Sequence, residues 1–274
     1  MKLQYLGTAA AEGFPGVFCT CENCLKAWKN GGRNIRSRSQ AIIDGKLLVD
    51  WPSDTFYHSV LHKVDLAEVS YCLITHSHPD HCYPDDLFYA RPGFSEPPEG
   101  NDLWICGSAD VYAVVGANIE QAGRYLKWKT VEPFQPFTLG IYTITALKAQ
   151  HGTASPYIYS ISDGKSNFLY AHDTDYFPDE TWAYLRTADI RFDLVSMDCT
   201  EGASESLPYI GHMCLGTNKR CREMLLKLGA ADNRTKFVLN HFSHNGLLTC
   251  YDDFAPLAEK DGFLTSYDGM IIEV

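Results

Sequence analysis

The sequence predicts an α/β fold for residues 1–274, arranged as a single domain. Short apolar runs rich in β-branched residues alternate along the chain with segments of helical periodicity. No internal repeat longer than this alternation is evident. The chain has 274 residues and is 45% hydrophobic, which suffices for one large domain with a buried core. Several apolar runs end directly before a His or an Asp, which places candidate ligands at strand ends.

Charge and composition narrow the classes of partner. The formal net charge of -11 disfavours a broad nucleic-acid surface, which normally has a basic excess. No apolar run approaches the ~20 residues of a membrane span and no apolar leader opens the chain, so we expect a cytoplasmic protein without a membrane partner. The 10 cysteines are then expected as thiols or thiolate ligands rather than as a disulfide framework.

The first half of the chain reads as strands separated by short helices. The dipeptide Asp44-Gly45 predicts a hairpin turn between two of these strands. The segment 83–101 carries several prolines and aromatic residues and directly follows the His-rich segment 75–81, so we expect an irregular wall of the substrate pocket there. Predicted strands cover 2–6, 39–43, 46–49, 69–74 and 103–106, and predicted helices cover 25–30, 54–62 and 109–125.

The second half continues the alternation, and its strands deliver isolated polar residues. His151 follows one apolar run, Asp173 another, and His241 a third. A lone His after a strand more often has a structural role than a ligand role. Position alone therefore does not decide whether these residues bind a metal ion. Predicted strands cover 140–149, 157–162, 167–171, 194–197, 236–240, 263–266 and 271–274, and predicted helices cover 180–187 and 215–228.

The segment Thr75-His76-Ser77-His78-Pro79-Asp80-His81 is the strongest local signal. It follows a β-branched run, and Pro79 prevents the strand from continuing far. His76 and His78 point to the same side of an extended segment, and a turn at Pro79 brings Asp80 and His81 round to face them. Imidazole nitrogens and carboxylates favour Zn, Mn or Fe over Ca. A His-rich surface loop is the alternative, but the pattern favours two adjacent ions.

A second candidate metal site lies near the N-terminus. Cys19, Cys21 and Cys24 have the C-x-C-x-x-C spacing that can hold a structural zinc. Only three ligands are local, so a fourth must come from a distant segment. Merely neighbouring thiols are the alternative interpretation.

The His-rich segment resembles the signature of the metallo-β-lactamase superfamily. The resemblance implies an αβ/βα four-layer sandwich with two mixed β-sheets and a two-metal site at its edge. It also implies a carboxylate, Asp50, that hydrogen-bonds the His-rich loop, and it places His172 in a slot usually held by a small residue, where it would crowd the site or add a ligand. The implied ligands are His76, His78 and His151 on one ion, Asp80, His81 and His241 on the other, and Asp173 between them.

The remaining motifs resemble one branch of this superfamily, the PhnP-type phosphodiesterases. These motifs are an N-terminal Gly-Thr loop, the cysteine cluster with His244 three residues after the last ligand, Met197-Asp198-Cys199, and a terminal Asp-Gly-Met. His244 is then the implied fourth ligand of the structural zinc. The branch implies hydrolysis of a small, cyclic ribosyl phosphodiester by a hydroxide that two divalent ions activate, with His212 as general acid and Asp80 also counted as catalytic. Cys214 stands where the branch tends to have an acidic residue.

Three alternatives to this function remain open. A tRNA 3′-processing nuclease shares the metal motif, but the chain lacks a long basic arm and its charge disfavours RNA. A thioester or lactone hydrolase is not excluded by any motif. A non-enzymatic binding protein would be expected to have lost ligands. A homodimer is left open, and so is the loop with Arg33, Arg36 and Arg38, which is either a phosphate site or, more simply, a solvated loop.

Overall fold

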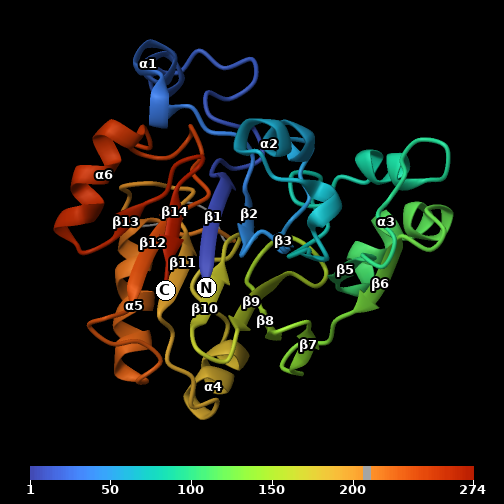
Figure 1. The fold of residues 1–274 in the computed structure, drawn as a ribbon. Coiled ribbons are helices and arrows are strands. Elements are labelled where there is room, and N and C mark those ends of the chain that lie inside the picture. The colour runs from blue at the N-terminus through green and yellow to red at the C-terminus, as the bar shows by residue number, and fades with distance from the viewer. Residues whose placement is uncertain (206–210) are drawn as a thin grey trace.

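The computed structural model describes residues 1–205 and 211–274, and it contains two seven-stranded sheets (Figure 1). The first sheet has the order β14-β1-β2-β3-β4-β5-β6, and the second has the order β13-β12-β11-β10-β9-β8-β7. The strands are β1 (Lys2–Gly7), β2 (Gln40–Ile43), β3 (Leu47–Val49), β4 (Tyr71–Leu73), β5 (Leu103–Gly107), β6 (Leu126–Thr130), β7 (Phe137–Leu139), β8 (Tyr142–Lys148), β9 (Tyr157–Ser162), β10 (Asn167–Ala171), β11 (Leu194–Asp198), β12 (Lys236–Asn240), β13 (Leu264–Thr265) and β14 (Ile271–Glu273).

Helices cover the outer faces of both sheets. Apolar side chains of α3 pack on one side of the first sheet, and those of α4, α5 and α6 pack on the second sheet. A third apolar cluster joins the inner faces of the two sheets. This is the predicted four-layer sandwich of two mixed sheets. The helices are α1 (Glu22–Asn30), α2 (Thr55–His62), α3 (Ala109–Gln121), α4 (Asp179–Thr187), α5 (Leu215–Lys227) and α6 (Tyr251–Lys260), with 3₁₀ turns η1 (Gly32–Asn34), η2 (Leu66–Glu68) and η3 (Asp85–Ala90).

Both sheets combine antiparallel and parallel pairs. Strands β3 to β6 pair in parallel in the first sheet, and β10 to β13 do so in the second. Strand β8 runs in the same direction as β10, because both pair antiparallel with β9. The carboxyl ends of β4, β8, β10 and β12 deliver the loops from which we expect the ligands. Open α/β sheets commonly bind ligands at such strand ends.

Most predicted elements are present, with shifts that have local causes. Asp44 and Gly45 have φ of 51° and 69°, as a hairpin turn with two left-handed residues requires. The helix predicted over 109–125 ends at Gln121, because the chain turns at Gly123, with φ 69°, to enter β6. The expected strand at 69–74 is only Tyr71–Leu73.

Strands β6 and β7 and helix α6 were not expected. The lysines of β6 and the short length of β7 weaken their strand patterns, and Pro256 lies inside α6. Within the described residues, no helix is both long enough and apolar enough to cross a membrane. A single domain over residues 1–274 stays a prediction.

Candidate metal centres and catalytic cavity

The seven predicted ligands of the catalytic site come together at one edge of the two sheets. The first sheet contributes the loop after β4, and the second sheet contributes the loops after β8, β10 and β12. We call these seven side chains the catalytic cluster: His76, His78, Asp80, His81, His151, Asp173 and His241.

One group of three histidines lies on one side of the catalytic cluster. His78 Nδ1 is 3.0 Å from His76 Nε2 and 3.1 Å from His151 Nε2. The nitrogens of these three rings lie within 4.8 Å of one another. Three imidazoles that converge on one point are a suitable donor set for zinc or another transition metal.

A second group lies beside the first and combines two imidazoles with a carboxylate. His81 Nε2 is 3.1 Å from Asp80 Oδ2 and 3.3 Å from His241 Nε2. These donor atoms also lie within 4.8 Å of one another. This mixed nitrogen and oxygen donor set can hold a divalent ion of the same kind.

Asp173 lies between the two groups and faces each with a different oxygen. Its Oδ1 is 3.7 Å from His151 Nε2, whereas its Oδ2 is 3.0 Å from both His81 Nε2 and His241 Nε2. Oδ2 is buried and has no hydrogen-bond partner of acceptable geometry among the described residues. A buried carboxylate oxygen without such a partner is destabilising unless a cation satisfies it. The donor set therefore fits a pair of metal ions.

The opposite nitrogens of four rings are held by other groups. His81 Nδ1 is 2.7 Å from Asp50 Oδ2, and His151 Nδ1 is 2.9 Å from the carbonyl oxygen of Gly211. Likewise, the Nδ1 atoms of His76 and His241 are each 2.9 Å from a threonine hydroxyl, that of Thr75 and that of Thr200. Such contacts fix each ring so that Nε2 faces the cluster, which is how ligating histidines are usually oriented.

The protonation of these groups suits cation binding. Burial lowers the pKa of His76 and of His241, which keeps their lone pairs available. Burial opposes ionisation of Asp80, but His81 outweighs it and lowers the pKa of Asp80. Burial would also lower the pKa of His81, but Asp173, Asp80 and Asp50 raise it. The His81 ring lies among three carboxylates, which indicates that this part of the catalytic cluster favours positive charge.

Three strand-end residues have left-handed backbone conformations. Asp50, Asp173 and His241 have φ of 71°, 51° and 63°. Non-glycine residues rarely adopt such values, which occur mainly where a site over-determines the backbone. The turn at each position re-aims the side chain toward the cluster instead of along the strand.

His212 lies beside the cluster and is paired with Asp198. Its Nδ1 is 3.0 Å from Asp198 Oδ2 and 4.0 Å from Asp173 Oδ1. Its side chain is 24% exposed, and it lines the cavity. Burial alone would lower the pKa of His212, but Asp198, with Asp173 and Glu201, raises it to about 9.

Asp198, known from the sequence only as part of the Met197-Asp198-Cys199 motif, is a functional residue that was not predicted. Asp198 accepts hydrogen bonds from the backbone N–H of Asp173 (3.1 Å), of Thr200 (2.9 Å) and of Met213 (2.9 Å), and it holds His212. A buried Asp at the end of an apolar strand was the available signal. Its importance depends on contacts between loops far apart in sequence.

The cluster opens into a cavity of about 770 Å³. Beyond the ligands, its walls include Glu12, Thr200, Glu201 and Asn245. None of the described residues that line it is a Lys or an Arg. The segment 83–101, expected as a wall of this cavity, borders a different one. This expectation was wrong because η3 turns that segment toward α3, where Asn118 donates to the carbonyl of Pro84.

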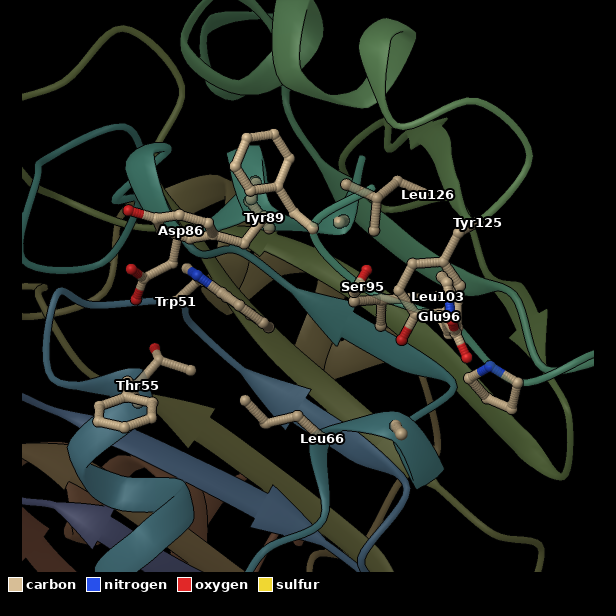
Figure 2. Close-up of a pocket in the computed structure, with 17 residues that line it drawn as sticks. Trp51, Thr55, Leu66, Asp86, Tyr89, Ser95, Glu96, Leu103, Tyr125 and Leu126 are labelled. Atoms are coloured by element: carbon tan, nitrogen blue, oxygen red, sulfur yellow. The ribbon is translucent and has the colours of Figure 1, made fainter. Parts of the chain in front are cut away.

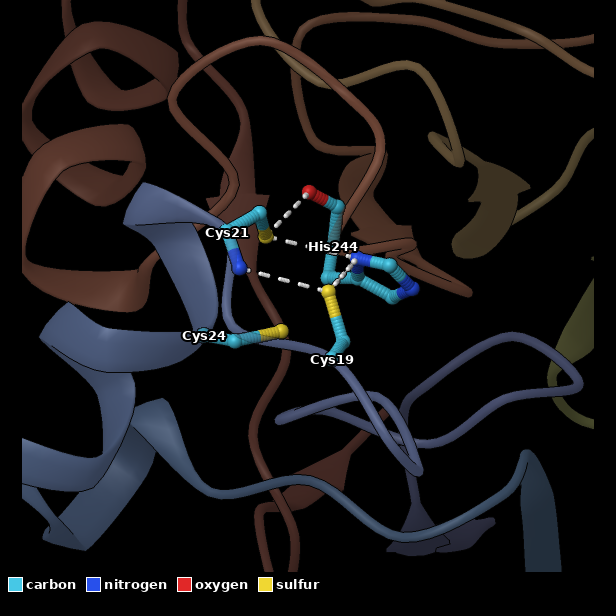
Figure 3. Close-up of side chains that lie close together, drawn as sticks. All are labelled: Cys19, Cys21, Cys24 and His244. Carbon is cyan, nitrogen blue, oxygen red and sulfur yellow. Dashed lines mark hydrogen bonds between the residues drawn. The ribbon is translucent and has the colours of Figure 1, made fainter.

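The four residues of the second predicted metal site also come together (Figure 3). We call Cys19, Cys21, Cys24 and His244 the cysteine cluster. His244 Nδ1 is 3.4 Å from the sulfur of Cys19 and 3.5 Å from that of Cys21. The four donor atoms lie within 4.8 Å of one another, as a tetrahedral zinc site of three thiolates and one imidazole requires.

The residues around the cysteine cluster allow this approach. A Cβ at Gly16 would lie 2.4 Å from Cδ2 of His244, so only glycine leaves room for the ring. Glu12 Oε1 is 3.4 Å from the other nitrogen of His244, and Glu12 also lines the catalytic cavity. The cysteine cluster therefore adjoins the mouth of that cavity.

His172 neither crowds the catalytic cluster nor joins it. Its ring points into the second sheet, where Nε2 is 2.7 Å from Ser196 Oγ and Nδ1 is 3.1 Å from Asn240 Nδ2. Burial lowers the pKa of His172 well below its usual value. It acts as a buried, hydrogen-bonded histidine.

Of the three arginines, Arg33 is exposed, Arg38 is half-buried and Arg36 is buried, and none of them lines the catalytic cavity. Arg36 is buried and donates from Nη1 to Ser266 O at 2.7 Å and to the hydroxyl of Thr8. Arg38 pairs with Asp54 at 3.1 Å, and Arg33 lies over the ring of Tyr267. The solvated-loop interpretation was wrong for Arg36, because its guanidinium is buried between the hydroxyl of Thr8 and the carbonyl of Ser266, whereas Arg33 remains exposed.

Comparison with known proteins agrees with this geometry. The family model described as "Beta-lactamase superfamily domain" matches residues 48–242, more than half of the chain. The chain belongs to the metallo-β-lactamase superfamily. No curated protein matches it by sequence.

Solved structures share the fold of this metallo-β-lactamase superfamily member at low sequence identity. A diphosphatase from the PhnP family is 20% identical with a TM-score of 0.73, over 100% of this chain and 97% of that chain. Zn²⁺-bound PqqB from Methylobacterium extorquens is 17% identical with a TM-score of 0.77, over 100% of both chains. Human tRNase Z, short form, is 16% identical with a TM-score of 0.67, over 100% and 99%.

Proposed function

We propose that the chain is a metal-dependent phosphodiesterase that hydrolyses a small phosphodiester of the cyclic ribosyl phosphate type. The position of Asp173 carries the proposal, because its two oxygens face two separate groups of ligands. Family membership supports a hydrolase, and the resemblance to PhnP-type proteins supports the phosphate ester.

Two ions would be held in this arrangement. His76, His78 and His151 would hold one, while Asp80, His81 and His241 would hold the other, with Asp173 shared. When bound, zinc or manganese ions would supply Lewis acidity that lowers the pKa of water and offsets the charge of the phosphate. The nitrogen and carboxylate donors also permit iron.

The cavity itself favours a small substrate of low charge. Its described walls contain no Lys or Arg but do contain Glu12 and Glu201, so the ions and a protonated His212 would be the groups that offset phosphate charge. A nucleic acid carries many phosphates and needs an extended basic surface, which argues against a tRNA nuclease. Carboxylates at the walls can instead accept hydrogen bonds from the hydroxyls of a sugar.

His212 is placed to give a proton to the leaving group. Asp198 holds Nδ1, so the ring presents its other nitrogen, Nε2, for proton transfer in the cavity. Asp198 also orients the ring, as a carboxylate does for a general acid–base histidine. The leaving alkoxide would take the proton from Nε2 as its bond to phosphorus breaks.

A substrate panel tests this function. The metal-loaded protein should turn over a ribosyl cyclic phosphate and bis(p-nitrophenyl) phosphate, and it should be much slower on a thioester, a lactone, a precursor tRNA and a diphosphate ester. Asp173→Asn, measured on the same substrates, controls for contaminating enzymes. Robust turnover of one of the other classes without turnover of the phosphodiesters would refute the proposal.

A further inference from the structure

A second cavity lies away from the catalytic one, on the side of the first sheet that carries η3. It has a volume of about 580 Å³ and opens between α2, the end of β3 and the segment 86–98 (Figure 2). It shares no described lining residue with the catalytic cavity. A cavity of this volume matches the size of small-molecule sites in proteins.

Aromatic rings form much of its wall. Trp51 is almost fully buried, whereas Phe56, Tyr89 and Phe94 are 69%, 57% and 60% exposed. Figure 2 shows Trp51 on one side of the cavity and Tyr125 on the other. Large exposed rings gathered around a cavity commonly mark a binding site.

The charge of the cavity has one sign. Asp86 and Glu96 line it, and no Lys, Arg or His is among its described lining residues. Within the described parts of the chain, neither carboxylate has a basic group within 4.0 Å. Burial, together with Asp85, raises the pKa of Asp86, which reflects a carboxylate without a nearby cation.

Trp51 adds an unsatisfied donor. Its indole N–H is buried and has no hydrogen-bond partner among the described residues, so it could be satisfied only by an acceptor on the ligand and not by the cationic group itself. The electron-rich faces of tryptophan and tyrosine attract cations, and they do so most strongly where water is excluded. The wall thus combines π-faces with negative charge.

We propose that this cavity binds an organic ammonium cation with an apolar body. The rings would take the apolar body and the face of the cation, and Asp86 and Glu96 would offset its charge. An organic anion would meet two uncompensated carboxylates. A neutral apolar molecule would cover those carboxylates without a counter-charge.

The site lies next to the metal-binding loop but does not depend on it. The Trp51 backbone N–H donates to the carbonyl of His81 at 2.7 Å, and Tyr83 donates back to Trp51 at 2.8 Å. The side chains that would contact the cation do not belong to the catalytic cluster. Binding is therefore expected with or without catalytic metals, whatever the enzyme's substrate.

Titration calorimetry of the full chain with benzyltrimethylammonium chloride tests the proposal. We expect saturable one-site binding, with phenylacetate and benzyl alcohol binding far more weakly. Asp86→Asn should weaken binding roughly tenfold, because it removes a charge-assisted contact, and Glu96→Gln should weaken binding by less, because its side chain is exposed and its charge is partly screened. Asp85→Asn makes the same change of charge beside the cavity without lining it, so its affinity should stay within about twofold, as for a screened surface charge.

Two outcomes would overturn the proposal. One is that the ammonium probe binds no more tightly than phenylacetate to the folded wild-type protein. The other is that Glu201→Gln, in the catalytic cavity, weakens binding while Asp86→Asn and Glu96→Gln do not. Phe94→Leu, which retains an apolar side chain, gives a second check: the loss of a π-face should weaken the ammonium probe and leave benzyl alcohol nearly unchanged.

Discussion

The catalytic cluster takes its side chains from the loops after β4, β8, β10 and β12, on both sheets. In the cysteine cluster, Cys19, Cys21 and Cys24 lie in one short segment and only His244 is distant. The catalytic cluster therefore needs both sheets to be in place, whereas the cysteine cluster needs one short segment and one distant loop. We expect the catalytic cluster to govern chemistry and the cysteine cluster to govern stability.

The two clusters meet at the loop after β12. His241 and His244 are on the same loop, and Glu12 contacts His244 at the mouth of the catalytic cavity. The two clusters would not have separate roles in chemistry and stability if a substitution in one cluster changed the geometry of the other. Variants in each cluster measure how far they are separate.

The largest effect is expected for Asp173→Ala. Because both groups of ligands share Asp173, activity on a phosphodiester should fall by at least about 10³-fold, as expected for a loss of several kcal/mol of charge stabilisation. Elemental analysis after metal saturation should show loss of catalytic metal, whereas the zinc that we predict at the cysteine cluster should be kept. Full activity with both catalytic ions retained would refute the shared-ligand model.

His212→Ala should have the next largest effect on activity, and the size of this effect should depend on the leaving group of the substrate. Esters with poor leaving groups should lose ~10²–10⁴-fold, the usual contribution of general acid catalysis, while a nitrophenyl ester should lose far less. Metal content should not change. An equal loss on both esters would indicate that His212 positions the phosphate, and a loss of metal would make it a ligand.

The sequence allowed the prediction of the fold and of which residues gather in both clusters. The reason is that ligands at strand ends follow motifs of fixed spacing, such as His76 to His81, and a sheet edge brings them together. Their role as ligands stays a prediction, because the motif fixes positions and not the ions that bind there.

Two features that depend on long-range packing were not predicted. The pairing of Asp198 with His212 joins a strand end to a loop fourteen positions later, and no local pattern marks it. The burial of Arg36 depends on Thr8 and Ser266, which lie at opposite ends of the chain. Charged residues in a basic loop normally remain solvated, so the composition of the loop favoured an exposed Arg36, which was wrong.

Asp50→Asn should have an intermediate effect. Asp50 holds His81 through Oδ2 and the backbone N–H of Thr75 through Oδ1, at 2.7 and 2.8 Å. An amide keeps the size but weakens the hold on His81, so metal affinity or activity should fall about 10–100-fold. Asp54→Asn is the control, because Asp54 accepts hydrogen bonds from the backbone and side chain of Arg38 and belongs to neither cluster. Unchanged metal affinity in Asp50→Asn would mean that His81 does not need this anchor.

Cys21→Ser should have the smallest effect on chemistry and a clear effect on stability. The variant should lose its structural zinc and melt roughly 5–10 °C lower, because a bound metal adds to folding stability and a loss of ~2–3 kcal/mol shifts a domain of this size by that much. Turnover per folded molecule should change only a few-fold, since none of the seven catalytic ligands belongs to the cysteine cluster.

Gly16→Ala tests the same site without removing a thiolate. The new Cβ would push against the His244 ring, so this variant should also lose zinc and melt at a lower temperature. Unchanged zinc content and melting temperature in Cys21→Ser would refute the prediction of a structural zinc site. If turnover in Cys21→Ser or Gly16→Ala fell as far as in Asp50→Asn, the two clusters would not have separate roles. The loop after β12 would then transmit the displacement of His244 to His241.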